Sequence, residues 1–215
     1  MGKGTIGGKI VLEGEKGYRD ALKSIKSGQA ELRSEMKLCA SQFKESQNTL
    51  EALSKKHEIL TKQVDTQKQK IDVYRDAMAA WNKAREDAAQ KTEDLKTALE
   101  VAEKGMKEMS SASEDNAQAV EEQKKKIGEL KEKLVLAEEM CTKAAQKTQS
   151  YATAANNAQV ELNNMESELN KTTKQMQEAE KNTDKCATSI DKYGQETEVA
   201  TEKINIFGDV LKANL

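Results

Sequence analysis

The chain of 215 residues carries 35 Lys and Arg against 37 Asp and Glu, so its net charge is −2. Only 36% of its residues are apolar and 3% are aromatic, whereas globular domains are about 45–50% apolar. The balanced charge argues against sequence-independent nucleic-acid binding, and no run approaches the ~18 apolar residues of a membrane-spanning helix. Because proline is absent and Lys, Glu, Gln and Ala are abundant, we expect long helices rather than a compact core.

The N-terminal segment, residues 1–17, differs from the rest of the chain. It contains the β-branched and apolar run Lys9–Glu13, which Gly7 and Gly8 precede and Gly14 follows. This pattern predicts one short strand. Since a single strand is not stable alone, Ile10, Val11 and Leu12 would pair with a second copy, a partner or another part of the protein. The alternative is an extended tail.

The rest of the chain has an apolar period of 3.5 residues. With Leu22 at heptad position a, 20 of the 26 a and d positions between Leu22 and Met109 are apolar, against a background of 36%. The same register continues past residue 110 to Leu211. A period sustained this long is typical of a coiled coil. We call the a and d positions in this register the seam.

The seam residues that we expect to carry helix association share a large apolar or aromatic side chain. They are Leu22, Ile25, Leu32, Met36, Phe43, Leu50, Leu53, Leu60, Val64, Ile71, Tyr74, Met78, Trp81, Leu99, Ile127, Leu130, Leu134, Leu162, Met165, Leu169, Met176 and Ile190. Alanine and polar residues fill many other seam positions, which lowers stability and can fix the register. The predicted fold is therefore all-α, with long helices in a coiled coil and one short N-terminal strand.

Breaks in the pattern divide the helical part of the chain. The sequence predicts a first long region at 18–109, a break at 110–116, a second long region at 117–207 and a C-terminal end at 208–215. Ser111 and Glu114 have the spacing of a capping box, and Ser46–Thr49 forms a second, weaker break. A continuous rod and a hairpin closing at 105–116 both remain open, as does the oligomeric state.

No residue pattern indicates catalysis. Cys39, Cys141 and Cys186 all fall on the seam, where small core residues are expected, and no Cys or His cluster has the spacing of a zinc site. His57 has no catalytic partner in its motif. The acidic and basic runs around Glu121–Lys126 are typical of a solvated helix face. We therefore expect no enzyme activity, no cofactor and no metal site.

Several segments, taken together, resemble the N-terminal region of tail tape measure proteins of long-tailed bacteriophages and related prophages. The segments that carry the resemblance are Lys9–Glu13, Gly14–Ile25, Glu35–Leu38, Ser41–Ser46, Leu50–Gln63, Gln67–Ile71, Asn157–Leu169 and Phe207–Lys212. Members of that family run on for several hundred residues, so we expect this chain to be a fragment or a short relative.

The resemblance implies a structural function and several partners. Helices of the tape measure protein would set the length of the tail tube during virion assembly, because a helix converts residue number into distance. The resemblance also implies a homo-oligomer of parallel copies, three being the first expectation, with the tail tube protein and tail assembly chaperones as partners. The chain would lie in the host cytoplasm during assembly and then in the tail lumen of the virion, without specific nucleic-acid binding or membrane insertion.

Two other classes of protein share the composition. One is a generic cytoplasmic coiled-coil scaffold, which needs nothing more than the heptads. The other is a helical pore-forming toxin or translocator, which would need an apolar hairpin that this sequence lacks.

Overall fold

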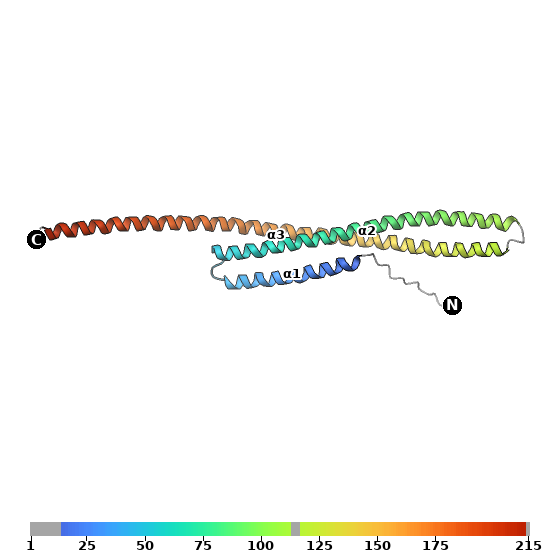
Figure 1. The fold of residues 1–215 in the computed structure, drawn as a ribbon, viewed down its shortest axis with the longest axis horizontal. Coiled ribbons are helices and arrows are strands. Elements are labelled where there is room, and N and C mark those ends of the chain that lie inside the picture. Colours follow the sequence, from blue (N-terminus) through green and yellow to red (C-terminus); the bar gives the residue numbers. More distant parts are fainter. Residues whose placement is uncertain (1–13, 113–116, 214–215) are drawn as a thin grey trace. The chain divides into compact units, whose positions relative to one another are not determined.

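In a computed structural model, the structure describes residues 14–112 and 117–213. Three helices follow in chain order: α1 (Glu15–Gln42), α2 (Leu50–Ala112) and α3 (Ala117–Ala213) (Figure 1). Within this part of the chain there is no strand, so the all-α prediction is confirmed. The predicted strand at Lys9–Glu13, with Ile10, Val11 and Leu12, lies outside the described residues.

Helix α1 begins where a glycine changes the backbone direction. Gly14 has a φ of +87°, a conformation that residues with a side chain adopt only under strain. The first helical hydrogen bond follows at once, from the Tyr18 amide to the Gly14 carbonyl at 3.2 Å. Glu15 lies in the first turn, where its negative charge suits the partial positive charge of the helix start.

The connection between α1 and α2 coincides with the weaker break predicted at Ser46–Thr49. The Phe43 amide donates a hydrogen bond to the Cys39 carbonyl, and the Ser46 amide donates one to the Phe43 carbonyl. Thr49 then caps α2, because its Oγ1 accepts a hydrogen bond from the Ala52 amide at 3.4 Å and its carbonyl accepts one from Leu53 at 3.0 Å. The heptad period alone does not reveal this turn, since Phe43 and Leu50 continue it without a phase shift.

The stronger break coincides with the connection between α2 and α3. Helix α2 continues to Ala112 and α3 begins at Ala117. The capping box of Ser111 and Glu114 lies outside the residues whose side chains the structure describes. Helix α3 then continues through residue 207 to Ala213.

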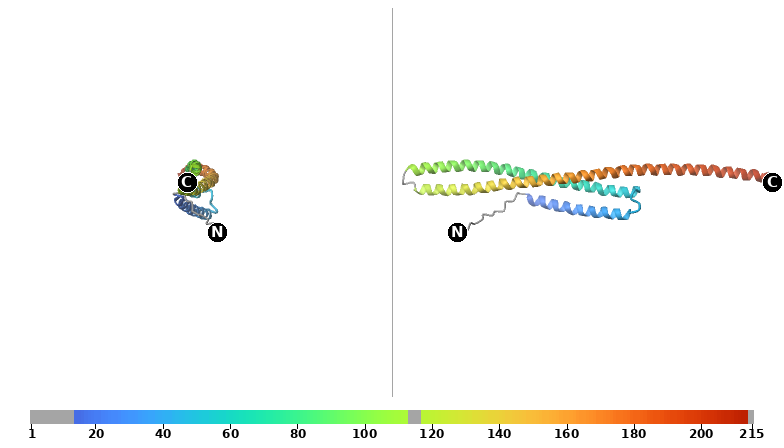
Figure 2. Two further views of the ribbon diagram at one scale, coloured as in Figure 1. Left: turned by 90° about the vertical axis from the view of Figure 1, so that its right-hand side faces the viewer. Right: turned by 180° about the vertical axis from the view of Figure 1, so that it is seen from behind.

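The described residues belong to two compact units. Unit 1 comprises Met1–Gly28 and Thr66–Leu162, and unit 2 comprises Gln29–Asp65 and Asn163–Leu215. In unit 1, α2 and α3 lie side by side and run in opposite directions, with the first turns of α1 against one end of the pair (Figure 2). The hairpin alternative, rather than the rod, therefore describes unit 1.

The core of unit 1 is poor in bulky residues. Trp81 is fully buried at its centre, and Ile71, Ile127 and Leu162 are also buried. The other buried apolar residues in the described part of this unit are all alanines: Ala77, Ala88, Ala137, Ala144, Ala155 and Ala158. Alanine removes little apolar area from water, so the few large side chains carry a high share of the stability of the unit.

Trp81→Ala tests how much a large buried side chain contributes to the stability of unit 1. Truncating a buried Trp typically costs about 3–5 kcal/mol, and we expect a loss of this order in the free energy of unfolding, measured by urea titration with far-ultraviolet circular dichroism. Val101→Ala is the matched control, since Val101 is 68% exposed on the same helix and should change stability by less than about 0.5 kcal/mol. Equal effects of the two substitutions would contradict the core described here.

Candidate functional site: the helix seam

The seam is where unit 1 brings α2 and α3 together. The Tyr74 and Tyr151 ring centroids are 6.3 Å apart, Gln67 Nε2 donates to the Ala158 carbonyl at 2.7 Å, and Gln123 Nε2 donates to the Ala102 carbonyl at 3.1 Å. All six residues occupy heptad position d. As the α2 number rises from 67 to 102, the α3 number falls from 158 to 123, so the helices are antiparallel in one constant register.

Ion pairs flank the seam of unit 1 in the same register. Lys70 contacts Glu161 at 3.2 Å, Lys96 contacts Glu138 at 3.7 Å and Lys131 contacts Glu103 at 3.0 Å. The first pair joins two g positions and the other two join e positions. Because most of these side chains are more than 40% exposed, each pair contributes only about 0–1 kcal/mol, and their main effect is on register and orientation.

Gln67 is the principal polar feature of the seam. It is fully buried, and its Nε2 donates both to the Ala158 carbonyl and to Glu161 Oε2, at 2.7 and 2.9 Å. Lys70 reaches the same Glu161 oxygen at 3.2 Å. A buried amide keeps these hydrogen bonds only when a carbonyl and a carboxylate lie at this height on α3, so a shift by part of a heptad would leave the amide unsatisfied.

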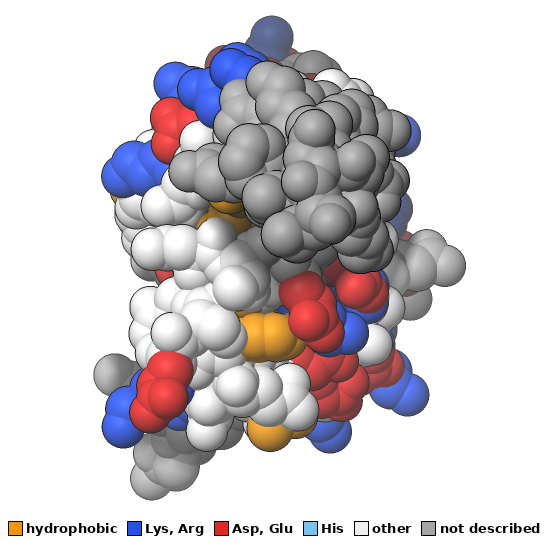
Figure 3. Space-filling view, turned by 90° about the vertical axis from the view of Figure 1, so that its left-hand side faces the viewer, with side chains coloured by type: hydrophobic (Ala, Val, Ile, Leu, Met, Phe, Trp, Pro, Cys, Tyr) orange, Lys and Arg blue, Asp and Glu red, His pale blue; other side chains and the backbone are white. Residues whose placement is uncertain are grey.

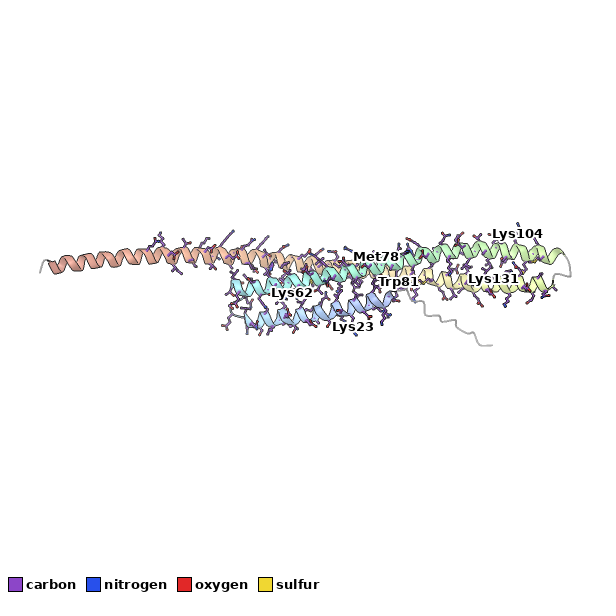
Figure 4. The ribbon with its side chains drawn as sticks, in the orientation of Figure 1. Lys23, Lys62, Met78, Trp81, Lys104 and Lys131 are labelled. Carbon is purple, nitrogen blue, oxygen red and sulfur yellow. The ribbon has the colours of Figure 1, made fainter. Side chains whose placement is uncertain are left out.

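A charged cluster joins the start of α1 to the seam. Lys147 Nζ lies 5.9 Å from the centroid of the Trp81 ring and 3.2 Å from Glu15 Oε1, and Figure 4 places Trp81 on α2 beside the first turns of α1. Glu15 is buried, so this pair is worth more than the exposed pairs. Trp81 Nε1 is buried without a hydrogen-bond partner in the described part of the chain, so the ring is held by packing and by the Lys147 charge over its face.

Unit 2 repeats this arrangement with α1 as a third helix. Lys56 on α2 contacts Glu168 on α3 at 3.0 Å, both at position g, and Gln63 Nε2 donates to the Leu32 carbonyl of α1 at 3.3 Å. A groove of about 340 Å³ opens among all three helices, and Cys39 and Leu53 are buried in its lining.

The predicted seam residues divide by burial. The buried ones are Leu53, Leu60, Val64, Ile71, Trp81, Ile127 and Leu162. The half-buried ones are Leu22, Ile25, Leu32, Met36, Phe43, Tyr74, Met78, Leu99, Leu130, Leu134, Met165, Leu169 and Met176. Leu50 and Ile190 are exposed, at 36% and 70%. Leu50 is the first residue of α2, and every described side chain from residue 181 to 192 is exposed.

Several buried residues were not among the predicted site residues. Ala52 and Ile59 lie at position c and Ala77 at position g, yet all three are nearly inaccessible. Their burial reflects a third helix, which widens the covered face beyond a and d. The signal in the sequence was the apolar pair Ile59–Leu60, which a two-helix seam does not need. Gln67 and Thr172 fell on the seam but were counted as polar interruptions, although both are fully buried.

The other residues considered in the sequence analysis differ in burial. Glu121 contacts Lys124 at 3.4 Å, and His57 is half buried on α2. Cys39 is buried, Cys141 half buried and Cys186 exposed, and all three are free thiols. Over the described residues, no group of three or more His, Cys, Asp or Glu side chains is placed to hold a metal ion, and no described helix is long and apolar enough to cross a membrane.

One surface ion pair shifts the pKa values of its members. Lys62 donates to Glu58 Oε1 at 2.7 Å, one helical turn away on α2. This hydrogen bond, with the charge of Lys62, lowers the pKa of Glu58 below its ordinary value, and the same contact raises the pKa of Lys62. Acidic and basic side chains also stand close to one another on the face shown in Figure 3.

No family model, curated protein or solved structure matches this chain.

Gln67→Leu tests the buried amide. A leucine at this d position should raise the free energy of unfolding by about 1 kcal/mol, since polar seam residues lower stability in exchange for register. The variant should also pair its helices in more than one register. This is measured as additional disulfide cross-links between one cysteine introduced on α2 and one introduced on α3. Gln69→Leu, on the exposed face of the same turn, should change neither property. A destabilised Gln67→Leu variant with one register would contradict this role.

Glu58→Gln tests the pH dependence of the surface pair. A lowered carboxylate pKa stabilises the folded state at pH values above it, and this contribution is lost as the pH falls through the folded pKa. The raised Lys62 pKa acts in the opposite direction, because its contribution to the stability of the folded state is present at lower pH and is lost as the pH rises through the folded pKa. The stability difference between wild type and variant, from thermal unfolding at low salt, should therefore be largest near neutral pH. It should vanish in about 1 M NaCl, and a pH-independent difference would contradict the pairing.

Proposed function

We propose that this chain is the N-terminal part of a phage tail tape measure protein, whose helices set the length of the tail tube. The observation that carries the proposal is the length of the helices, with 63 residues in α2 and 97 in α3. At about 1.5 Å per residue, α3 alone corresponds to roughly 145 Å of distance. A protein built of little else fits the task of measuring better than that of binding a small molecule.

Coiled-coil association is the second part of the proposal. Three features support it: buried residues at a and d, contacts between like positions across the seam, and ion pairs at e and g. Antiparallel helices in a coiled coil bring e opposite e and g opposite g, and these pairs select orientation.

The antiparallel pairing of α2 and α3 in unit 1 requires one further step for a measuring function. A closed hairpin covers half the distance that its residues would span when extended. We propose that α2 and α3 separate on assembly and enter the tail as extended helices. The alanine seam and the polar residues Gln67, Gln123 and Thr148 support this step, since little apolar area is exposed when the helices part.

The partners follow from the same proposal. Several parallel copies, three as the first expectation, would lie in the tail lumen, with the tail tube protein around them. Tail assembly chaperones would hold the chain in the host cytoplasm before the tube forms. The low net charge of −2 supports a filament that can later leave the tube ahead of the DNA.

A coiled-coil scaffold is the second candidate function. The observation that favours it is the hairpin itself, since a scaffold works in the closed form. The two functions differ in whether residue number sets a length.

Removing matched heptads from both helices separates the two functions. Deleting 83–96 together with 129–142 takes two heptads from each helix and keeps the antiparallel register. If both helices lie extended in the tail, the 28 lost residues shorten the tail by about 42 Å, and a closed hairpin shortens it by about 21 Å. Tail lengths are measured by electron microscopy of the phage that carries the deletion.

The control keeps residue number constant. Exchanging the charges of one pair, as Lys96→Glu with Glu138→Lys, should leave tail length unchanged. If a heptad-deletion variant still assembles phage and its tail length is unchanged, the measuring function is contradicted and the scaffold function is favoured.

A further inference from the structure

Unit 1 contains an apolar groove on the stretch of α2 and α3 beyond the start of α1. The groove has a volume of about 330 Å³ and is lined by the charged residues Asp87, Lys91 and Lys133 and by five apolar residues, which we call its floor: Ala84, Ala88, Leu136, Ala137 and Met140. Leu136, one of the floor residues, is 41% exposed. We call this feature the arm groove. Every residue that lines it lies on α2 or α3.

The arm groove continues the helix face that α1 covers. Lys147, which binds Glu15 at the start of α1, occupies position g on α3, and Met140 is the next g position towards the groove. On α2 the equivalent step leads from Ala77 to Ala84, both at g. Ala77 is fully buried and Ala84 only half buried. The groove is therefore the place on this face where cover by a third element stops.

The chain itself has an apolar segment that can reach the groove. Along α3, Met140 and Leu136 are 7 and 11 residues from Lys147, or about 10 and 16 Å at the helical rise. Leu12 and Ile10 precede Glu15 by 3 and 5 residues, or about 10 and 16 Å in extended conformation. The Glu15–Lys147 ion pair fixes the common origin of both distances. Ile10, Val11 and Leu12 can thus lie over the apolar floor without any movement of α1.

We propose that the segment Lys9–Glu13 docks in the arm groove of its own chain. The segment supplies three consecutive large apolar side chains, which is what a groove with an alanine floor and a half-exposed leucine can accept. Docking covers the face of the α2–α3 pair that continues from α1, and so keeps a helix of a second copy from packing there. The N-terminal segment then limits self-association through this face, whether or not the chain measures tails.

Disulfide trapping tests the proposal in the full chain. Val11→Cys is combined with Leu136→Cys after Cys141→Ala and Cys186→Ser, while the buried Cys39 is kept. Two cysteines form a disulfide only when their Cα atoms come within about 7 Å. The matched control pairs Val11→Cys with Glu139→Cys, at the same height on α3 but at position f on the exposed face. We expect an intramolecular disulfide that forms at least about tenfold faster than in the control, because docking raises the effective concentration.

Hydrogen exchange provides a second measurement that does not depend on cysteines. In the triple variant Ile10→Ser, Val11→Ser, Leu12→Ser, amides in residues 84–91 and 133–140 should exchange several-fold faster than in wild type, with no change in α2 around Gln67. Equal exchange in both proteins, together with equal trapping rates in the two cysteine pairs, would overturn the proposal. A disulfide found only between chains would also overturn it, and would assign the groove to a second copy.

Discussion

The antiparallel register between α2 and α3 in unit 1 is the constraint on which the remaining features depend. It places Gln67 against Ala158, Tyr74 against Tyr151 and Gln123 against Ala102, and it decides which charges meet across the flanks. Moving one helix by part of a heptad would separate the Gln67 amide from Ala158 and Glu161 and the Trp81 ring from Lys147. A few residues therefore specify a register that the alanines alone would leave open.

The same seam explains why the pairing is specific without being strong. Alanine contributes little burial, and the flanking ion pairs are exposed to solvent and screened by salt. Bulky residues such as Trp81 and Ile71 are spaced far apart, so stability is concentrated in a few layers. Such a pairing suits a protein that folds into a defined form and later gives it up, as the proposed function requires.

The heptad period predicted the helices and most of their buried face, because the physical requirement for burial at a and d is written directly in residue type. Leu53, Leu60, Val64, Ile71, Trp81, Ile127 and Leu162 were found in this way. The direction of pairing could not be predicted, since a and d positions are the same in parallel and antiparallel helices. The burial of Ile59 and Ala77 was not predicted, because it depends on a third helix. The turn between α1 and α2 that creates this third helix leaves no mark in the heptad pattern, since Phe43 and Leu50 keep the apolar period across it.

The central claim is that α2 and α3 pair in the free protein and lie extended when they measure a tail. The most direct measurement is the distance between spin labels at Lys83→Cys and Thr142→Cys, which are exposed positions at the same level of the antiparallel register, on the outer faces of the two helices. In the free protein we expect a distance below about 25 Å, since paired helix axes lie about 8–10 Å apart. In assembled tails the separation of 59 residues along the chain should place the labels about 90 Å apart. A short distance that persists in assembled tails would contradict the account.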